Sequence, residues 1–448
     1  MIRKAFKILC FIFVLSGVIV GCSNSPPNDD TVVVDPISDP DPDPTPTKTI
    51  HSVITFKNPG ALIDVFFYDV KQANKNLNNA SEANEIFKID DANGLRVPIR
   101  GEEKLPAHPS AGNVVENLYD DVLKSISLAK QARGAKGLKI FASKKLDNKT
   151  SFPGWVKDAN GIIPEKYAIL LADYIEFMNS KGIQIDYLGI DNEFVYNEGN
   201  ITPQKYAQTI TALRSLATTR GFTVPVLVGY DDYGPEKRNW VKNLIDGGWG
   251  DTMDVYGTHY YPAWRPKNKL ISDLALIGNR PFWSTEPHWG SKSDANDFDE
   301  AEAGMVTFWD QIDVGMSGFM WWSYAIGDNL RGKLMRAASA PLLGARPIKI
   351  TDIDGENIDT LGKLQTRAFI EDKTITVYAI NMNEIVRDDY TFKLEGSSIE
   401  GNVDVLQWTA STSIDGQKLY LNTKGDDKNV FSLTLPKRSI TRFILTIK

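Results

Sequence analysis

The feature that most constrains the fold of this chain is a repeated alternation of short apolar runs with helical patterns, from about residue 60 to residue 330. Eight runs resemble buried strands, at residues 62–67, 94–98, 138–142, 187–190, 224–229, 254–258, 281–284 and 318–322. Eight strand–helix units predict an α/β fold, the (β/α)8 TIM barrel, in which all strands are parallel. A doubly wound sheet is the alternative.

The clearest helical pattern covers residues 165–181. Its apolar residues recur at helical spacing, at Tyr167, Leu170, Leu171, Tyr174 and Met178. Pro164 suits the first turn of a helix, and Gly182 suits its end. Further helices are expected to open at Thr202 and at about residue 299.

After residue 345, short strands with alternating polar and apolar residues replace the strand–helix units. We expect strands at 374–380, 403–408, 430–435 and 440–447, separated by polar turns. We therefore assign residues 51–345 to the barrel domain and residues 346–448 to a small antiparallel β-sandwich domain. Residues 51–57, ahead of the barrel, are able to add a strand to this second domain.

Residues 1–21 have the pattern of an export signal. Basic residues accompany an apolar stretch over residues 5–20, which is too short and badly flanked for a membrane-spanning helix. The stretch ends in Ile19-Val20-Gly21-Cys22, which resembles the cleavage site of bacterial lipoproteins. We expect cleavage to leave Cys22 as a lipid-carrying first residue, with a simple secretory signal as the alternative.

Residues 22–50 form a linker, with seven Pro and six Asp between residues 23 and 49. Such a segment is extended and semi-rigid, so we expect it to hold the barrel domain off the bacterial outer membrane, on its periplasmic or its outer face. Removal of residues 1–21 takes away Cys10 and three positive charges, so the net charge of −7 becomes −10. The remaining chain has no second cysteine for a disulfide, and its acidity argues against nucleic acid as a partner.

Two glutamates stand where predicted strands end. Glu193 closes the segment Asp191-Asn192-Glu193 after the fourth strand, and Glu286 lies in Ser284-Thr285-Glu286-Pro287 after the seventh. Strand ends of this kind meet at the C-terminal face of a barrel. Two carboxylates are the groups needed to cleave a glycosidic bond, because one protonates the leaving oxygen while the other attacks the sugar or activates water. Two unrelated surface glutamates are the alternative.

Several segments together resemble glycoside hydrolase family 30, a family of retaining (β/α)8 enzymes. The resemblance covers roughly residues 92–330 and rests on Leu95-Arg96-Val97-Pro98, Phe141-Ala142-Ser143 with Pro153-Gly154-Trp155, Asn192-Glu193, His259-Tyr260-Tyr261, Glu286 and Trp322. The chain departs from the family in having no Gly-rich segment near the first strand and in the residues after Pro98. Both departures concern the substrate pocket, so the resemblance does not carry a substrate.

The resemblance implies a role for each matching residue. Glu193 would be the acid/base and Glu286 the nucleophile, and their mutual repulsion is expected to keep Glu193 protonated. Arg96 would keep Glu286 ionised, or would form an ordinary salt bridge of the barrel. The substrate-binding residues implied are Arg96, Trp155, Asn192, His259, Tyr260, Tyr261 and Trp322, with Asn192 at a sugar 2-hydroxyl, Tyr260 or Tyr261 at Glu286, and His259 either a catalytic helper or structural.

Other carboxylates compete for these roles. Glu102, Glu103 and Glu198 are expected in loops without a strand before them. Asp231 and Asp232 follow the fifth strand, where solvation in a loop is the favoured interpretation and contact with sugar hydroxyls the other. No sequence motif for a cofactor or a catalytic metal is present, and we expect neither.

The sequence thus favours a retaining glycoside hydrolase that cleaves β-glycosidic bonds of an extracellular polysaccharide or oligosaccharide. An inactive, surface-exposed glycan-binding lipoprotein on the same barrel is the alternative. A metal-dependent barrel hydrolase is a third hypothesis, but four His in the whole chain make a poor ligand set. The sugar, the linkage and the oligomeric state stay open at this stage.

The lipid anchor is testable directly. We expect fatty-acid labelling of the wild-type protein in its host and its recovery with membranes, because acyl chains at Cys22 would bury apolar surface in the bilayer. Cys22→Ala should abolish labelling and release the protein. A wild-type protein that is unlabelled and soluble would contradict the prediction.

Overall fold

The computed structural model describes residues 49–71, 75–101, 106–144, 152–193, 201–232, 238–260, 267, 274–287, 297–321, 329–352, 364–412, 414–422 and 428–448. Residues 49–448 form one compact unit. Among the residues described, no helix is long and apolar enough to cross a membrane.

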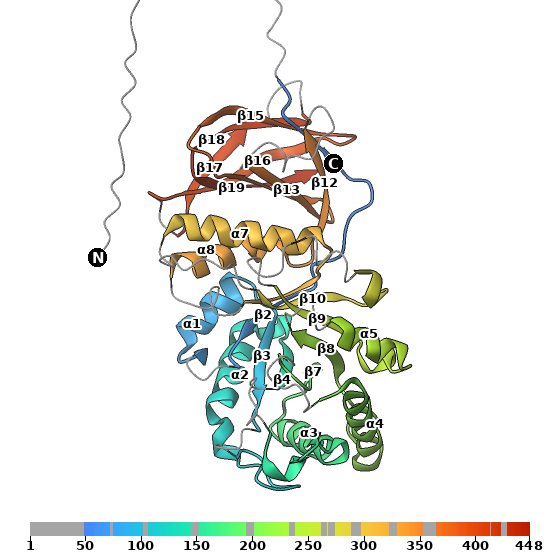
Figure 1. Cartoon of the computed structure of the whole chain (residues 1–448). Helices are drawn as coiled ribbons and strands as arrows, with labels where there is room; N and C mark the ends of the chain where they lie inside the picture. The colour runs from blue at the N-terminus through green and yellow to red at the C-terminus, as the bar shows by residue number, and fades with distance from the viewer. Residues whose placement is uncertain are drawn as a thin grey trace, which may run out of the picture. The chain divides into compact units, whose positions relative to one another are not determined.

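Eight parallel strands close into a barrel, so the predicted (β/α)8 fold is confirmed and the doubly wound alternative is wrong (Figure 1). The strands are β2 (Val65–Asp69), β3 (Gly94–Ile99), β4 (Lys139–Lys144), β7 (Tyr187–Gly189), β8 (Val226–Asp232), β9 (Val255–Tyr260), β10 (Phe282–Pro287) and β11 (Gly318–Trp321). Closure pairs β11 with β2, which brings the first and last barrel strands side by side. All eight predicted strands are present, and several extend beyond their predicted ends.

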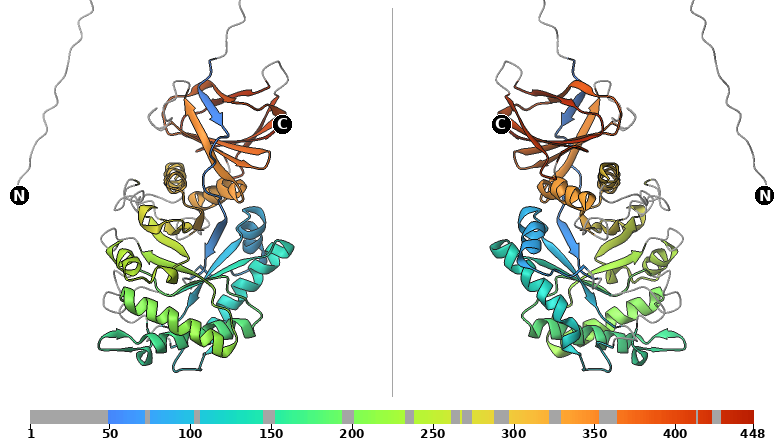
Figure 2. Two further views of the ribbon diagram at one scale, coloured as in Figure 1. Left: turned by 90° about the vertical axis from the view of Figure 1, so that its right-hand side faces the viewer. Right: turned by 90° about the vertical axis from the view of Figure 1, so that its left-hand side faces the viewer.

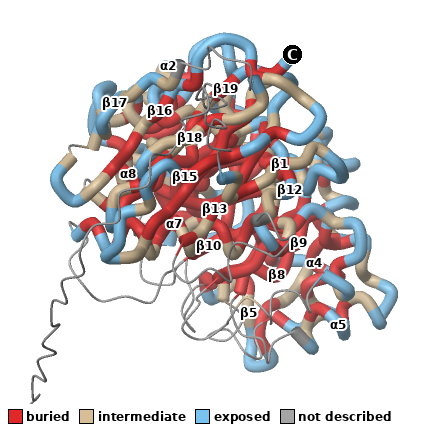
Figure 3. The backbone as a smooth tube through the Cα atoms, turned by 90° about the horizontal axis from the view of Figure 1, so that it is seen from above, coloured by how far each residue is buried: buried red, intermediate tan, exposed pale blue. Residues whose placement is uncertain are grey.

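Aromatic side chains fill the inside of the barrel below its mouth. Phe67, Phe141 and Trp283 contact one another there, with ring centroids 5.5 to 6.5 Å apart. The strands make room for these rings with glycine, because a Cβ atom at Gly94 would lie 2.3 Å from Phe67 and one at Gly318 would lie 2.6 Å from Trp283. The interior is therefore a packed floor under the site, and the barrel strands are buried along most of their length (Figure 3).

Helices follow most of the strands and surround the barrel (Figure 2). They are α1 (Ala80–Asn84), α2 (Asp120–Arg133), α3 (Pro164–Ser180), α4 (Pro203–Arg220), α5 (Arg238–Asp246), α7 (Phe298–Asp313) and α8 (Leu330–Ser339). The helix predicted over residues 165–181 is α3. At the start of α4 the Thr202 hydroxyl oxygen accepts the Lys205 N–H at 3.2 Å, a typical N-cap contact.

The second domain is one continuous nine-stranded sheet that folds over its own core. Its strands are β1 (Ser52–Thr55), β12 (Arg346–Asp352), β13 (Leu364–Glu371), β14 (Thr374–Asn381), β15 (Arg387–Leu394), β16 (Ile399–Thr409), β17 (Gln417–Asn422), β18 (Val430–Leu435) and β19 (Ser439–Ile447). β1 lies between β12 and β15 in this sheet, antiparallel to the first and parallel to the second (Figure 2). Phe392 and Phe431, in the two strands at one end of the sheet, contact Phe443 in the third strand from the other end, which is the packing of a sandwich.

The helix α7 joins the two domains (Figure 1). Its fully buried Trp309 contacts Phe369 and Tyr378 of the sheet, with centroids 5.6 and 5.0 Å apart. Asp313 at the end of the same helix accepts two hydrogen bonds from the Arg367 guanidinium, at 2.9 and 2.7 Å. An apolar contact and a bidentate ion pair thus hold the sheet against the barrel.

Trp309→Ala tests this interface. We expect the free energy of unfolding to fall by about 3–5 kcal/mol, because the substitution removes a large buried ring and leaves a cavity. Urea unfolding followed by circular dichroism measures the change. Tyr420→Ala is the matched control, since Tyr420 is 71% exposed, and should stay within about 0.5 kcal/mol. Equal effects of the two substitutions would contradict the prediction.

Candidate active site

Glu193 and Glu286 face each other at the mouth of the barrel. Glu193 follows β7, and Glu286 lies near the end of β10. One carboxylate oxygen of each lies within 4.8 Å of the other. Their side chains are 12% and 6% exposed, so both are largely withdrawn from solvent yet reachable from the mouth.

Irregular backbone aims these groups into the site. The pairing of β9 with β10 shifts register between Ser284 and Glu286, and the pairing of β8 with β9 shifts between Tyr230 and Asp232. Glu193, Tyr230 and Asp231 all have positive φ, at 54°, 76° and 48°. Such bulges re-aim side chains next to active sites, and positive φ in residues other than glycine is costly enough that the surroundings must hold it.

His259 lies at the centre of the carboxylates. Its Nδ1 is 3.2 Å from Glu193 Oε1, and its Nε2 is 2.9 Å from Asp231 Oδ1 and 3.7 Å from Glu286 Oε2. Because a carboxylate faces each ring nitrogen, the protonated imidazolium, in which both nitrogens donate, fits this position best. Burial alone lowers the pKa of His259, but the charge of Glu286 and the hydrogen bonds to Asp231 and Glu193 raise it to about 10.

The same contact acts on Glu193. Burial alone raises the pKa of Glu193, but the hydrogen bond with His259 and the positive charges of His259 and Lys71 outweigh burial and lower that pKa. On the sequence alone, repulsion from Glu286 is expected to keep Glu193 protonated. In the structure Glu193 is instead held ionised, because the imidazolium is closer than the second glutamate and of opposite charge.

Arg96 is fully buried under the site and holds the network together. Its guanidinium donates to Asp69 Oδ2 at 3.1 Å, to Asp231 Oδ2 at 2.6 Å, to Ser143 Oγ at 3.0 Å and to the Thr285 carbonyl at 2.8 Å. These contacts are the barrel salt bridge that the sequence allowed as an alternative. Arg96 supports the strand that carries Glu286 through its backbone.

Asp231 and Asp232 are not loop residues, so the favoured interpretation of the sequence was wrong. Both lie in β8 and are buried. Burial alone raises the pKa of Asp231, but Arg96 and His259 outweigh it and hold that pKa well below its usual range. Asp231 therefore supplies the buried negative charge that orients His259 and Arg96.

Lys71 is a site residue that the sequence reasoning missed. Lys71 follows β2 and is only 4% exposed. Its Nζ donates to Asn192 Oδ1 at 2.5 Å and lies 3.9 Å from Glu286 Oε2. Its backbone N–H donates to Asp69 Oδ1 at 2.7 Å. A signal was present, because the charged residues Asp69 and Lys71 stand at and just after the end of an apolar barrel strand, much as Glu193 follows the fourth strand.

Two other predicted residues lie elsewhere. The Tyr260 hydroxyl donates to Asp310 of α7 at 3.1 Å, since successive side chains of a strand point to opposite faces and His259 already faces the site. Tyr260 is therefore not the tyrosine at Glu286. Trp155 is half-buried, packs against the core and donates its indole N–H to the His108 carbonyl at 2.8 Å.

The remaining candidates lie outside the described residues. These are Tyr261, Trp322 and Cys22 together with the rival carboxylates Glu102, Glu103 and Glu198.

In the described part of the chain, Glu193, His259 and Glu286 are the grouping with metal-ligand spacing. A histidine must lose its proton to bind a metal, whereas the pKa of His259 is raised to about 10. Lys71 and Arg96 add positive charge next to the same carboxylates. The charges suit a protonated network better than a bound cation.

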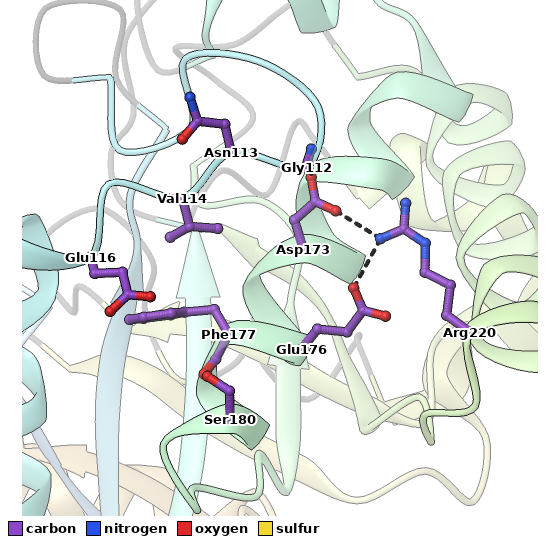
Figure 4. A pocket seen from close by; sticks show the side chains of 9 residues that line it. All are labelled: Gly112, Asn113, Val114, Glu116, Asp173, Glu176, Phe177, Ser180 and Arg220. Atoms are coloured by element: carbon purple, nitrogen blue, oxygen red, sulfur yellow. Dashed lines mark hydrogen bonds and ion pairs between the residues drawn. The ribbon is translucent and has the colours of Figure 1, made fainter.

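A hollow on the outside of the barrel is lined by α3, the end of α4 and the segment around residue 113 (Figure 4). Arg220 Nη1 donates to Asp173 Oδ1 at 2.7 Å and to Glu176 Oε2 at 3.0 Å. The Gly112 N–H donates to Asp173 Oδ2 at 2.6 Å. Because barrel helices return toward the N-terminal ends of the strands, Arg220 at the end of α4 lies at the opposite end from Glu193, and the hollow is a structural junction.

Comparison with known proteins supports the fold. No protein-family model matches the sequence, and no curated protein matches it. The structure is similar to a family 30 endoxylanase from Clostridium papyrosolvens, with a TM-score of 0.67 and 16% identity over 88% of this chain and 100% of that one. It is also similar to a family 30 xylanase from Clostridium acetobutylicum (TM-score 0.65, 16% identity, 88% and 99% covered) and to one from Talaromyces cellulolyticus (0.63, 18%, 88% and 99%). The predicted resemblance to family 30 is confirmed at the level of the fold, with the added β-sheet domain.

Arg96→Leu tests the buried network. We expect the free energy of unfolding at pH 7 to fall by about 3–5 kcal/mol, because Asp69 and Asp231 would keep buried charges without their main partner. The carboxylate of Asp231 has a depressed pKa, so its pairing stabilises the fold above pH about 4 and this stability is lost as pH falls. The difference between wild type and variant should therefore shrink toward pH 3.

Urea unfolding at several pH values measures the difference. Arg214→Leu is the matched control, because Arg214 forms an exposed pair with Asp251 at 3.3 Å and should cost less than about 1 kcal/mol. If Arg96→Leu lowers the free energy of unfolding as little as Arg214→Leu does, the buried network does not stabilise the fold as predicted.

Proposed function

We propose that this protein is a retaining glycoside hydrolase that cleaves β-glycosidic bonds of an extracellular polysaccharide or oligosaccharide by double displacement. The observation that carries the proposal is the approach of the Glu193 and Glu286 carboxylate oxygens to within 4.8 Å across the barrel mouth. Retaining enzymes place their carboxyl groups about 5–5.5 Å apart, whereas inverting enzymes leave about 6.5–9.5 Å for a water molecule.

Glu286 is the nucleophile in this proposal. Its Oε2 lies 3.7 Å from His259 Nε2 and 3.9 Å from Lys71 Nζ, so two cationic groups face the carboxylate that attacks. The carboxylate attacks the anomeric carbon while Glu193 gives a proton to the leaving oxygen. Glu193 then takes a proton from water, which attacks the glycosyl-enzyme and releases Glu286.

To act as an acid, Glu193 needs a proton, and before substrate binds this proton is on His259. His259 Nδ1 lies 3.2 Å from Glu193 Oε1, close enough for one proton to pass between them. When a sugar displaces water from the mouth, the ionised Glu193 loses solvation, which favours the neutral form of a carboxyl group. The proton can then move from His259 to Glu193 without exchange with solvent. Acid catalysis by Glu193 is possible as long as the His259–Glu193 pair holds that proton.

A glycan-binding barrel without activity is the second candidate. A binder gains nothing from burying Glu286, Asp231, Arg96 and His259 together, and such burial is expensive in free energy. The charge network therefore favours the enzyme. If both glutamates prove dispensable for binding and no bond is cleaved, the binding protein is the better description.

The substrate follows only by analogy. Three structures with this fold are described as xylanases, so xylan and other β-linked plant polysaccharides are the first substrates to test. We further propose that the chain acts outside the cytoplasm, tethered through Cys22 and the Pro/Asp-rich linker. The support for the tether is the sequence pattern of residues 1–50.

Glu286→Ala and Glu193→Ala should each lower kcat by several orders of magnitude and leave circular dichroism unchanged, since each removes one half of the carboxylate pair. Sodium azide should rescue Glu286→Ala and yield a glycosyl azide of inverted configuration. Proton NMR of the first product of the wild type should show retention. Near-wild-type rates in either variant, or an inverted first product, would rule the mechanism out.

His259→Gln should change the pH profile as well as the rate. In the wild type the pair of His259 and Glu193 keeps its last proton up to alkaline pH, because the pKa of His259 is raised to about 10. Without the imidazole, Glu193 must hold that proton alone. The alkaline limb of kcat/KM should therefore move to lower pH by about one unit or more. An unmoved limb would show that His259 has only a structural role.

A further inference from the structure

Lys71 neither transfers a proton nor attacks the sugar in the reaction written above, yet its side chain is almost fully buried beside the two glutamates. Its Nζ is 2.5 Å from Asn192 Oδ1, and Arg96 Nη2 lies 3.4 Å from the same oxygen. Asn192 itself is buried and precedes Glu193 directly. Burial of a lysine is costly unless its charge has a partner, so its position calls for an explanation.

The two cations determine which way the Asn192 amide points. An amide can present its oxygen or its NH₂ group to either side. If the amide were turned over, the NH₂ donors would face the ammonium of Lys71 and the guanidinium of Arg96, which have no acceptor to offer. The Asn192 oxygen therefore accepts from Lys71 and Arg96. The amide faces a ligand with its N–H donors.

We propose that Lys71 is a positioning residue that fixes the Asn192 amide as a hydrogen-bond donor toward the sugar. This inference rests on the proposed function and deepens it. The sugar group that fits is a free hydroxyl on the carbon next to the anomeric centre, which accepts from Asn192 and donates to the Glu286 carboxylate. A protonated amino group at that carbon could donate to Glu286 but has no lone pair to accept the Asn192 N–H, so the site favours sugars with a free 2-hydroxyl.

The contact itself is tested without any activity measurement. Urea unfolding is measured for Lys71→Met, Asn192→Leu and the double variant. Lys437→Met is the control, because its exposed side chain lies in the β-sheet domain. We expect the loss in urea midpoint of the double variant to be smaller than the sum of the two single losses, because the two residues act through one bond. Additive losses would overturn the proposal. If Lys71→Met does not fold, Lys71→Gln takes its place in the cycle.

The positioning role is tested with 4-nitrophenyl β-D-xyloside and β-D-glucoside and with the 2-deoxy counterpart of whichever is hydrolysed. In Lys71→Met, the ratio of kcat/KM for the 2-hydroxy substrate to kcat/KM for the 2-deoxy substrate should fall roughly 10- to 100-fold. A fall of this size is expected when one oriented hydrogen bond in a charged site is lost. Lys437→Met should keep the wild-type ratio.

Equal losses on both substrates would assign Lys71 to the charge of Glu286 alone and overturn the positioning role. Failure of the wild-type protein to hydrolyse these glycosides or any polysaccharide would count against the proposed function instead. The unfolding cycle would then still decide whether Lys71 holds Asn192.

Discussion

The ion pairs of Asp231 with Arg96 and His259 are the interaction on which the rest of this site depends. One carboxylate receives Arg96 at 2.6 Å through one oxygen and His259 at 2.9 Å through the other. Arg96 anchors the backbone at Thr285, one residue before Glu286, and His259 contacts both glutamates. Asp231 thereby fixes the relative positions of the two groups proposed to react.

Such a cluster is stable only because its charges are paired and shielded from water. Burial of single charges costs several kcal/mol each, and good geometry has to offset that cost. The barrel provides the geometry through two register shifts and three residues with positive φ. The local backbone strain and the buried charges lie in the same few residues, as expected where a structure is arranged for chemistry rather than for stability.

The β-sheet domain reaches the site through α7. Asp310 of this helix accepts from the Tyr260 hydroxyl next to His259, and Asp313, one turn later, is paired with Arg367 of the sheet. Trp309 adds the apolar contact between the same helix and the sheet. The second domain therefore helps to hold the strand that carries His259, although it contributes no group to the carboxylate pair among the residues described.

The sequence by itself determined the barrel, its eight strands and the placement of Glu193 and Glu286 at strand ends, because hydrophobic periodicity is a local property of the chain. It did not identify Asp231 as buried or Lys71 as part of the site, and it expected the wrong ionisation of Glu193. These depend on tertiary structure: Lys71 meets Asn192 across 121 residues of chain, and Asp231 is turned inward by a bulge in β8. Only barrel closure brings such groups together, and only their final distances decide which charge prevails.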